Sequence, residues 1–263
     1  MINACRLAIG GLFATVALQA FAQPSIADTG ALQARLAALD TEEVILRYAA
    51  RPGACGNGRH MYLVDDNGGD WPGRCRQGPV QLRIRLDETG VASLRKSIYS
   101  AVPGRTDATA TDIGEIPATA ASTWLLELAT TARVSVAEDA IAAAMFADAP
   151  DPWRELLVLV EDDTIAQPVR RHAIHWLGRS AARAATRNLA AIAESDFETT
   201  EMQKAAVFAL SRRHEPERGD MLLRIATTHR NPEVVASAFF WLAESPDERA
   251  LRLFEEVLVA EAK

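Results

Sequence analysis

Two histidines spaced one helical turn apart, His172 and His175, form the pair best placed for metal chemistry in this sequence. Imidazoles at this spacing can ligate one zinc ion, although a complete site needs further ligands. The next histidines, His214 and His229, fall in other segments of the chain. We therefore interpret His172 and His175 as solvent-facing or groove-lining side chains and predict no metal site.

A short acidic segment could bind calcium, because Asp65, Asp66, Asn67 and Asp70 supply hard oxygen ligands around two glycines. The EF-hand spacing is absent and no glutamate closes the loop, which favours an exposed polar turn. The sequence also contains no Walker loop, no G-x-G-x-x-G and no G-x-S-x-G. We predict no catalytic residue and no cofactor, and hence a protein that is not an enzyme.

Cysteine usage predicts one disulfide. Cys5 lies in a segment expected to be removed, which leaves Cys55 and Cys75 as an even pair. Their bond would close a loop of about 20 residues, which stabilises the fold by roughly 3 kcal/mol in the chain-entropy treatment. A metal site is the alternative, but neither cysteine has a partner at CxxC spacing.

Arginines cluster between residues 170 and 187. Such a cluster could contact an acidic partner, and we select Arg179, Arg183 and Arg187 as candidate partner-binding residues. The alternative is an ordinary solvated face. Aromatic residues could anchor a partner too, but most of them match buried phases, so we expect most of them inside the core. These aromatics are Trp153, Trp176, Phe208, Phe239, Phe240 and Trp241.

Residues 1–22 have the features of a signal peptide. One cation, Arg6, precedes an apolar run, and small residues flank Phe21 before Gln23. The alternative is a transmembrane anchor, but the apolar run is shorter than the ~20 residues that a spanning helix needs. We therefore expect an exported protein, periplasmic or secreted, with no stable membrane insertion after cleavage.

Composition narrows the class of protein further. The formal net charge is -7, which disfavours nucleic-acid binding because that requires clustered cations. The chain is 49% hydrophobic and only 6% aromatic, and its alanines favour helix. We expect a mostly α-helical protein.

Residues 23–116 predict a small antiparallel sheet with a short helix before it, an α+β region held by the Cys55–Cys75 bond. Apolar residues alternate with polar ones around Leu46 and again from Val80 to Leu86, as in half-buried strands. Asp87 to Gly90 supplies hairpin turn chemistry, and residues 60–64 could add a strand. Residues 103–114 are rich in turn-forming residues.

Residues 117–263 contain an internal repeat. Val136, Val169 and Met202 are spaced 33 residues apart, and Val234 follows after 32. Further apolar positions keep this phase at i, i+4 and i+8, and each unit has a second apolar stripe. Asn231-Pro232 and Asp151-Pro152 look like helix starts, and Gly178 and Gly219 look like points of chain reversal between helices.

The segments VRRHAIHWLG (169–178), MQKAAVFALS (202–211) and VVASAFFWLA (234–243) resemble HEAT repeats, and similar repeats occur in exported bacterial proteins and phycobilisome-lyase-type proteins. The resemblance covers about residues 117–263. It implies an α-solenoid of about four helical hairpins. Members of the HEAT-repeat family mostly act as protein-binding scaffolds, and we expect the binding groove to be lined mainly by the second helix of each hairpin.

We therefore predict an exported, non-enzymatic scaffold or adaptor that binds a protein or peptide. One alternative is a metal-dependent or hydrolytic envelope enzyme with a site between the two regions, drawing on His60, Asp65, Asp70 and His172. Another is an assembly or stabilising subunit of an envelope complex.

Overall fold

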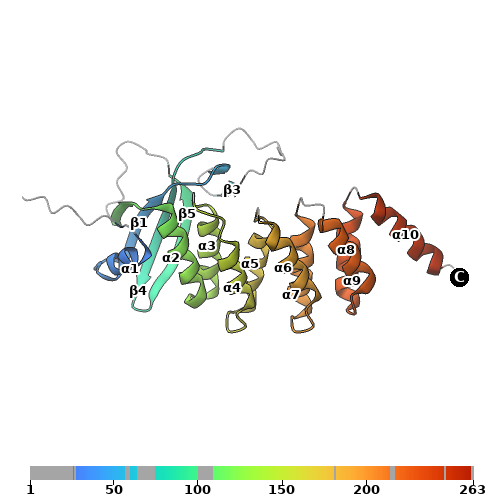
Figure 1. Cartoon of the computed structure of the whole chain (residues 1–263). Coiled ribbons are helices and arrows are strands. Elements are labelled where there is room, and N and C mark those ends of the chain that lie inside the picture. Colours follow the sequence, from blue (N-terminus) through green and yellow to red (C-terminus); the bar gives the residue numbers. More distant parts are fainter. Residues whose placement is uncertain are drawn as a thin grey trace, which may run out of the picture.

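A computed structural model describes residues 26, 28–56, 60–63, 75–99, 109–180, 182–213, 217–245 and 247–261. These residues form a mostly helical protein with a small sheet near its N-terminal end (Figure 1). The predicted signal segment 1–22 and the predicted acidic turn at 65–70 lie outside the described residues. Among the described residues, no helix combines the length and apolar character that a membrane crossing requires.

The main sheet has the strand order β5-β4-β1-β6. Strands β1 (Glu43–Tyr48), β4 (Val80–Asp87) and β5 (Gly90–Ile98) pair antiparallel, as the alternation predicted. Gly90 has a φ of 117° in the tight turn between β4 and β5. Strand β6 (Thr111–Glu115) pairs parallel to β1, so a strand that the sequence did not predict begins within the turn-rich stretch 103–114.

A second, two-stranded sheet pairs β2 (Ala54–Gly56) with β3 (Met61–Leu63). The predicted disulfide is present, because Cys55 in β2 is bonded to Cys75 with a Cα–Cα distance of 5.3 Å. A disulfide suits an oxidising compartment. We refer to β2 and β3 together as the stapled hairpin.

Ten helices lie in the described part of the chain. They are α1 (Thr29–Ala37), α2 (Ala118–Thr131), α3 (Val134–Met145), α4 (Trp153–Glu161), α5 (Gln167–Leu177), α6 (Arg183–Glu194), α7 (Thr200–Ser211), α8 (Glu217–Thr228), α9 (Pro232–Ala243) and α10 (Glu248–Glu261).

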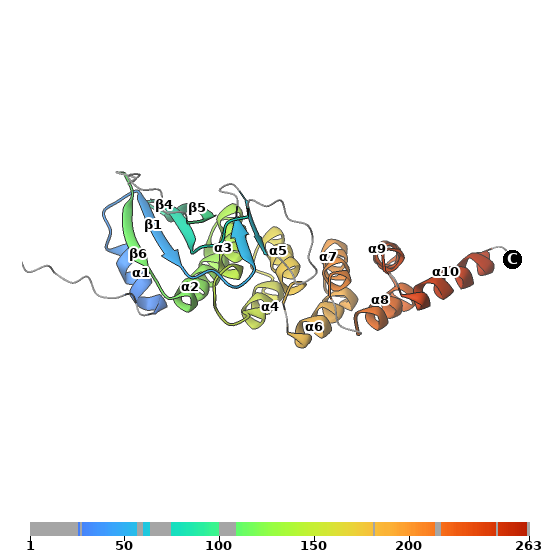
Figure 2. The same ribbon diagram turned by 90° about the horizontal axis from the view of Figure 1, so that it is seen from above.

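From α3 onward the helices form two layers that lead away from the sheet (Figures 1 and 2). The helices α3, α5, α7 and α9 contact one another in succession and make the first layer, while α4, α6 and α8 lie in the second. The closest packing joins α4 to α5, α6 to α7 and α8 to α9. If each repeat unit is taken as a first-layer helix followed by a second-layer helix, then the second-layer helix packs most closely on the first-layer helix of the next unit.

The periodic apolar residues form the core between these layers. Val136, Val169, Met202 and Val234 are each no more than 2% exposed, and Leu156, Leu189 and Leu222 are equally buried in the second helices. Full burial of such a side chain stabilises the fold by roughly 1.5–3 kcal/mol. The repeat in the sequence therefore corresponds to a repeated packing contact.

Polar contacts also link consecutive units. Gln167 donates from Nε2 to Thr199 Oγ1 over 2.7 Å, and one unit later Asn231 Nδ2 donates to Thr200 Oγ1 over 2.8 Å. Arg170 forms a half-buried ion pair of 2.6 Å with Glu198. These bonds fix the offset between neighbouring first helices.

The sheet and the first helices share one core. Residues of β1 and β4 that point to one side of the sheet pack with α1, α2 and α3. Tyr48 in β1 is fully buried and donates its hydroxyl to the backbone oxygen of Ala143 in α3 over 2.8 Å. The boundary expected near residue 116 therefore lies within continuous packing, and the division into 23–116 and 117–263 stays a prediction.

Of the residues predicted to mark the ends of helices, some have a different role in the structure. Gly178 has a helical φ of -60°, and its Cα faces α7 so closely that a Cβ would meet Ala209 at 3.0 Å. Gly219 lies inside α8 rather than between helices. Asn231 caps α9 as predicted, but Asp151 does not cap α4 and instead accepts a hydrogen bond from Ser180.

Candidate functional site

Two helices of the first layer share a sequence pattern in which a ring-bearing residue has a basic residue four positions before it and another four positions after it. Arg171 and His175 lie on α5, and Arg179 follows two residues after its end; Lys204 and Phe208 lie on α7, and Arg212 is the residue directly after its end. Residues at i, i+4 and i+8 share one side of a helix, and the two triplets are 33 residues apart, so they occupy equivalent places in successive units. We call these triplets the cationic–aromatic stripes.

The middle positions of the stripes belong to a longer row of rings. The centroids of His175 and Phe208 are 6.4 Å apart with planes 18° from parallel, and those of Phe208 and Trp241 are 4.9 Å apart. Phe240 meets Trp241 edge-on at 4.9 Å. We call His175, Phe208, Trp241 and Phe240 the ring row. It crosses α5, α7 and α9 on the outer side of the first layer.

The prediction that most aromatics lie inside the core holds only in part, because Trp153, Phe239 and Trp241 pack against the core without being fully buried. Trp176 is buried at 8% exposure, whereas Phe240 is 57% exposed. Trp153, Phe208, Phe239 and Trp241 are only half-buried. The periodic apolar residues identify the helices correctly. The equivalent positions 175, 208 and 240 in α5, α7 and α9, however, do not belong to the buried side of these helices.

A hollow of about 460 Å³ lies beside the ring row. Its walls come from α3, α5, α7 and α9, all of them first-layer helices, and not from the second helices expected to line the groove. The lining includes Glu138, Arg171, His172, His175, Glu201, Lys204 and Phe208. We call the outer side of the first layer, with the ring row and this hollow, the first-helix face.

His172 borders the hollow in a fixed orientation. Its Nε2 accepts a hydrogen bond of 3.1 Å from Nε1 of Trp176, which is possible only while that nitrogen carries no proton. Burial lowers the pKa of His172 below its usual 6.5; the positive charge of Lys96 lowers it further, while Asp139 opposes both effects. Lys96 and Asp139 are themselves paired at 2.9 Å. His172 is therefore neutral at neutral pH.

The surroundings of His175 are positively charged. Its ring lies between Trp176 and Phe208, and this packing partly desolvates it and lowers its pKa, although the residue still reaches solvent. The pKa is lowered further by His172, whenever that imidazole is itself protonated, and by the positive charges of Arg179 and Arg212. A negative group bound here would find a favourable potential.

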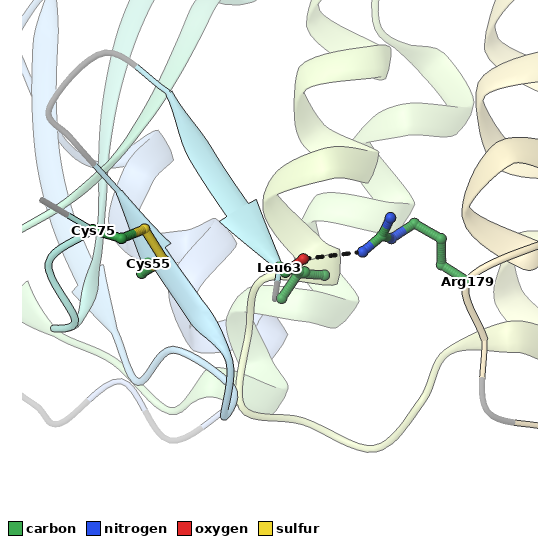
Figure 3. The surroundings of a disulfide bond; sticks show 4 residues. All are labelled: Cys55, Leu63, Cys75 and Arg179. Carbon is green, nitrogen blue, oxygen red and sulfur yellow. Dashed lines mark hydrogen bonds between the residues drawn. A yellow bond between two sulfur atoms is a disulfide. The ribbon is translucent and has the colours of Figure 1, made fainter. Parts of the chain in front are cut away.

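The stapled hairpin covers the first step of the same face. Ala142 of α3 stands 33 residues before His175, in the place where the later helices carry rings, and it is 8% exposed. Together with Met61 to Leu63 of β3 it lines a smaller hollow that reaches His175, Trp176 and Arg179. Arg179 Nη2 donates to the backbone oxygen of Leu63 over 3.2 Å, as Figure 3 shows beside the disulfide.

The three arginines selected from the sequence separate in the structure. Arg179 is half-buried against Trp176, with 5.8 Å from its Cζ to the ring centroid, and it holds the stapled hairpin. Arg183 and Arg187 are exposed on α6 in the second layer. Arg171 belongs to the arginine cluster seen in the sequence but was not among the selected residues, and Lys204 and Arg212 were missed, although their 33-residue spacing from Arg171 and Arg179 could have identified them.

The residues considered for metal chemistry are only partly within the described chain. His60 lies 6.3 Å from Tyr62 between ring centroids, at the stapled hairpin, while Asp65, Asp70 and His214 lie outside the described residues. Over the described ranges, no three His, Cys, Asp or Glu side chains gather so that they could hold a metal ion. The ring centroids of His172 and His175 are 6.2 Å apart.

Comparison with known proteins adds no family to this picture. No protein-family model matches the chain, and no curated protein matches it.

Proposed function

We propose that this protein is an exported, non-enzymatic scaffold whose helical part is a HEAT-like solenoid and whose first-helix face binds a protein or peptide. The observation that carries the proposal is the ring row. It places four rings on three successive helices, and Phe240 leaves 57% of its surface in solvent.

The periodic aliphatic residues form the core between the layers, and Trp241 packs at its edge, while His175 and Phe240 remain exposed. Aromatic side chains that are rigid and half-buried are the usual anchors of protein interfaces. The rim of the hollow is polar and charged, as interface rims are. The arrangement suits binding over several helices better than chemistry at one point.

The export part of the proposal is supported by the disulfide and by the character of residues 1–22. The HEAT-like part is supported by the two helix layers, the 33-residue period and the polar contacts between units.

Site-specific photocrosslinking tests the binding face. Phe240→p-benzoylphenylalanine in the full chain, expressed in its native host, should give a discrete protein adduct after irradiation. The matched control is Val158→p-benzoylphenylalanine in the second layer, where the exposed fraction is a similar 62%. Adding Phe208→Ala to the Phe240 variant should lower the adduct yield, because it removes the neighbouring anchor.

Adducts at position 158 with none at position 240 would place any partner on the other layer and refute the proposed face. Absence of adducts at both positions, in cells grown under several conditions, would argue against a scaffold that binds through either layer.

A further inference from the structure

Resting on the proposed function, we infer that the first-helix face binds an acidic peptide segment in extended conformation, with apolar side chains on the ring row and carboxylates at the cationic–aromatic stripes. The partner is thus a protein with an acidic, apolar-containing segment.

The charge of this face runs against that of the whole chain. The sequence has 35 acidic and 28 basic residues, yet the two stripes bring four Arg and Lys side chains to adjacent helices. Arg171 and Arg212 are exposed, and neither forms an ion pair with another residue in the described part of the chain. They are therefore available to a ligand's carboxylates without breaking an internal bond.

The other charges of the hollow are already engaged or lie at its edge. Lys204 reaches Glu201 and Glu233, both at 3.4 Å, and these exposed pairs are weak. Glu138 lies at the α3 side of the hollow. Arg179 and Arg212 lie near His175, and their positive charges favour a negative ligand at the centre of the face.

The spacing of the rings fits an extended chain. Every second side chain of an extended peptide points the same way, about 6.6–6.8 Å apart. The centroids of His175 and Phe208 are 6.4 Å apart, which matches this repeat, whereas Phe208 and Trp241 are only 4.9 Å apart and together form one broader apolar contact. A segment that crosses α5, α7 and α9 could therefore place one apolar side chain at His175 and the next at the Phe208–Trp241 contact.

The protein itself provides an example of an extended chain on this layer. Strand β3 lies over Ala142 of α3, the place equivalent to His175, and its Leu63 carbonyl accepts from Arg179. The stapled hairpin thus places an extended segment across a small hollow from the first step of the face.

Fluorescence anisotropy with defined peptides tests the inference. The probe is a labelled decapeptide of alternating Asp and Leu, and its counterparts alternate Lys with Leu, Ser with Leu and Asp with Ser. With the full-length mature protein at low ionic strength, we expect the Asp–Leu peptide to bind at least about tenfold more tightly than each counterpart, a difference of about 1.4 kcal/mol. Added salt should weaken its binding, because exposed charges are screened.

Charge reversal locates the contact. Arg171→Glu with Arg212→Glu should weaken Asp–Leu binding by at least about tenfold, whereas the same charge change at Arg183 and Arg187 on α6 should leave it unchanged. A far-ultraviolet spectrum and a melting curve establish that both double variants fold. If the α6 pair weakens binding more than the first-layer pair, the contact lies on the second layer and the inference is wrong.

Other outcomes overturn the inference in distinguishable ways. Equal binding of the Ser–Leu and Asp–Leu peptides, or no binding of any peptide, would refute the inference that the ligand is an acidic segment. The proposed scaffold function would still be tested separately by crosslinking. The peptides could fail to bind while oligo-dT or phosphatidylglycerol vesicles bind to the wild type and not to the Arg171 and Arg212 variant. That result would show that these basic residues bind a different anionic ligand, and the inference would be wrong.

Discussion

Arg179, at the end of α5, donates a hydrogen bond of 3.2 Å to the backbone oxygen of Leu63, a residue that precedes it by 116 positions. This bond joins the stapled hairpin to the row of helices and sets where the first-helix face begins. An arginine that the sequence suggested as a partner contact therefore serves as an internal clamp.

The clamp predicts a local effect of Arg179→Gln. Losing a hydrogen bond from a charged donor should lower the free energy of unfolding by about 1–3 kcal/mol, and the loss should be felt first in β3. Hydrogen exchange at Met61 to Leu63 should accelerate. Arg183→Gln is the matched control because Arg183 is exposed on α6, and equal acceleration in both variants would contradict a clamp.

The disulfide predicts a larger and more global loss. Cys55 and Cys75 are 20 positions apart, and opening a loop of that length should cost roughly 3 kcal/mol of stability. Denaturant unfolding of the Cys55→Ala, Cys75→Ala variant measures it. Dithiothreitol should shift the wild-type midpoint toward that of the variant and leave the variant's own midpoint unmoved; a wild type unaffected by full reduction would refute the prediction.

Arg213 predicts the cost of removing a buried charge with many acceptors. Arg213 is 2% exposed. Its guanidinium donates hydrogen bonds to Thr186 Oγ1 and to the backbone oxygens of Leu177, Ser180 and Ala182. These hydrogen bonds hold the connection between α5 and α6 in place. Arg213→Met should lower the free energy of unfolding by about 3 kcal/mol, because several carbonyls lose their donor. Arg224→Met, which removes an exposed pair with Glu194, should cost less than about 1 kcal/mol.

Gly178 predicts a steric effect. A Cβ there would lie 3.0 Å from the Cα, Cβ and oxygen of Ala209, so Gly178→Ala should separate α5 from α7 and cost about 1–3 kcal/mol. Gly30→Ala in α1 is the control, since its Cβ would meet nothing nearer than 3.5 Å. That change should be neutral or stabilising by up to about 1 kcal/mol. Thermal melting of both variants checks the contrast, and a Gly178→Ala variant as stable as wild type would rule out tight contact.

The histidines predict how stability changes with pH. The folded pKa values of His172 and His175 lie below the ordinary 6.5, so below pH 6.5 the unfolded chain binds protons that the folded chain does not. Stability is therefore fully present above 6.5 and falls as the pH drops toward the folded pKa values. Lys96, Asp139, Arg179 and Arg212 are charged groups that shift these pKa values, and Glu138, Arg171, Glu201 and Lys204 line the same hollow.

Replacing the pair should flatten this dependence. His172→Gln with His175→Gln should lose less stability than wild type between about pH 7 and pH 5, as measured by denaturant midpoints across that range. Arg171→Gln, which changes a side chain of the same hollow and leaves both histidines in place, should keep the wild-type slope. An unchanged slope in the histidine variant would show that other groups dominate.

Much of the fold could be read from local patterns. The period of two around Leu46 and Leu82 identified β1 and β4, and the 33-residue period identified the helices and the inward positions Val169, Ala173 and Leu177. These patterns are reliable because burial on one side of an element imposes its own periodicity on the sequence. Strand β6 was missed because its pairing with β1 is supplied by a distant segment.

The site was harder to predict for a physical reason. Exposed positions carry no periodic apolar requirement, so the sequence placed His175 near the surface but did not separate the half-buried Phe208 from the buried Trp176. Gly178 was taken for a turn residue, although its role is the close approach of Ala209, which lies on another helix.

By itself, the amino-acid sequence determined the helical period, the inward residues of each unit and the cysteine pair. Each of these follows from local spacing or from residue chemistry. Only the tertiary structure decided which helix packs on which, that Arg179 holds Leu63, and that rings from α5, α7 and α9 line up on one face. Those relationships depend on how separate elements are placed against one another, because contacts between residues far apart in the chain leave little local pattern.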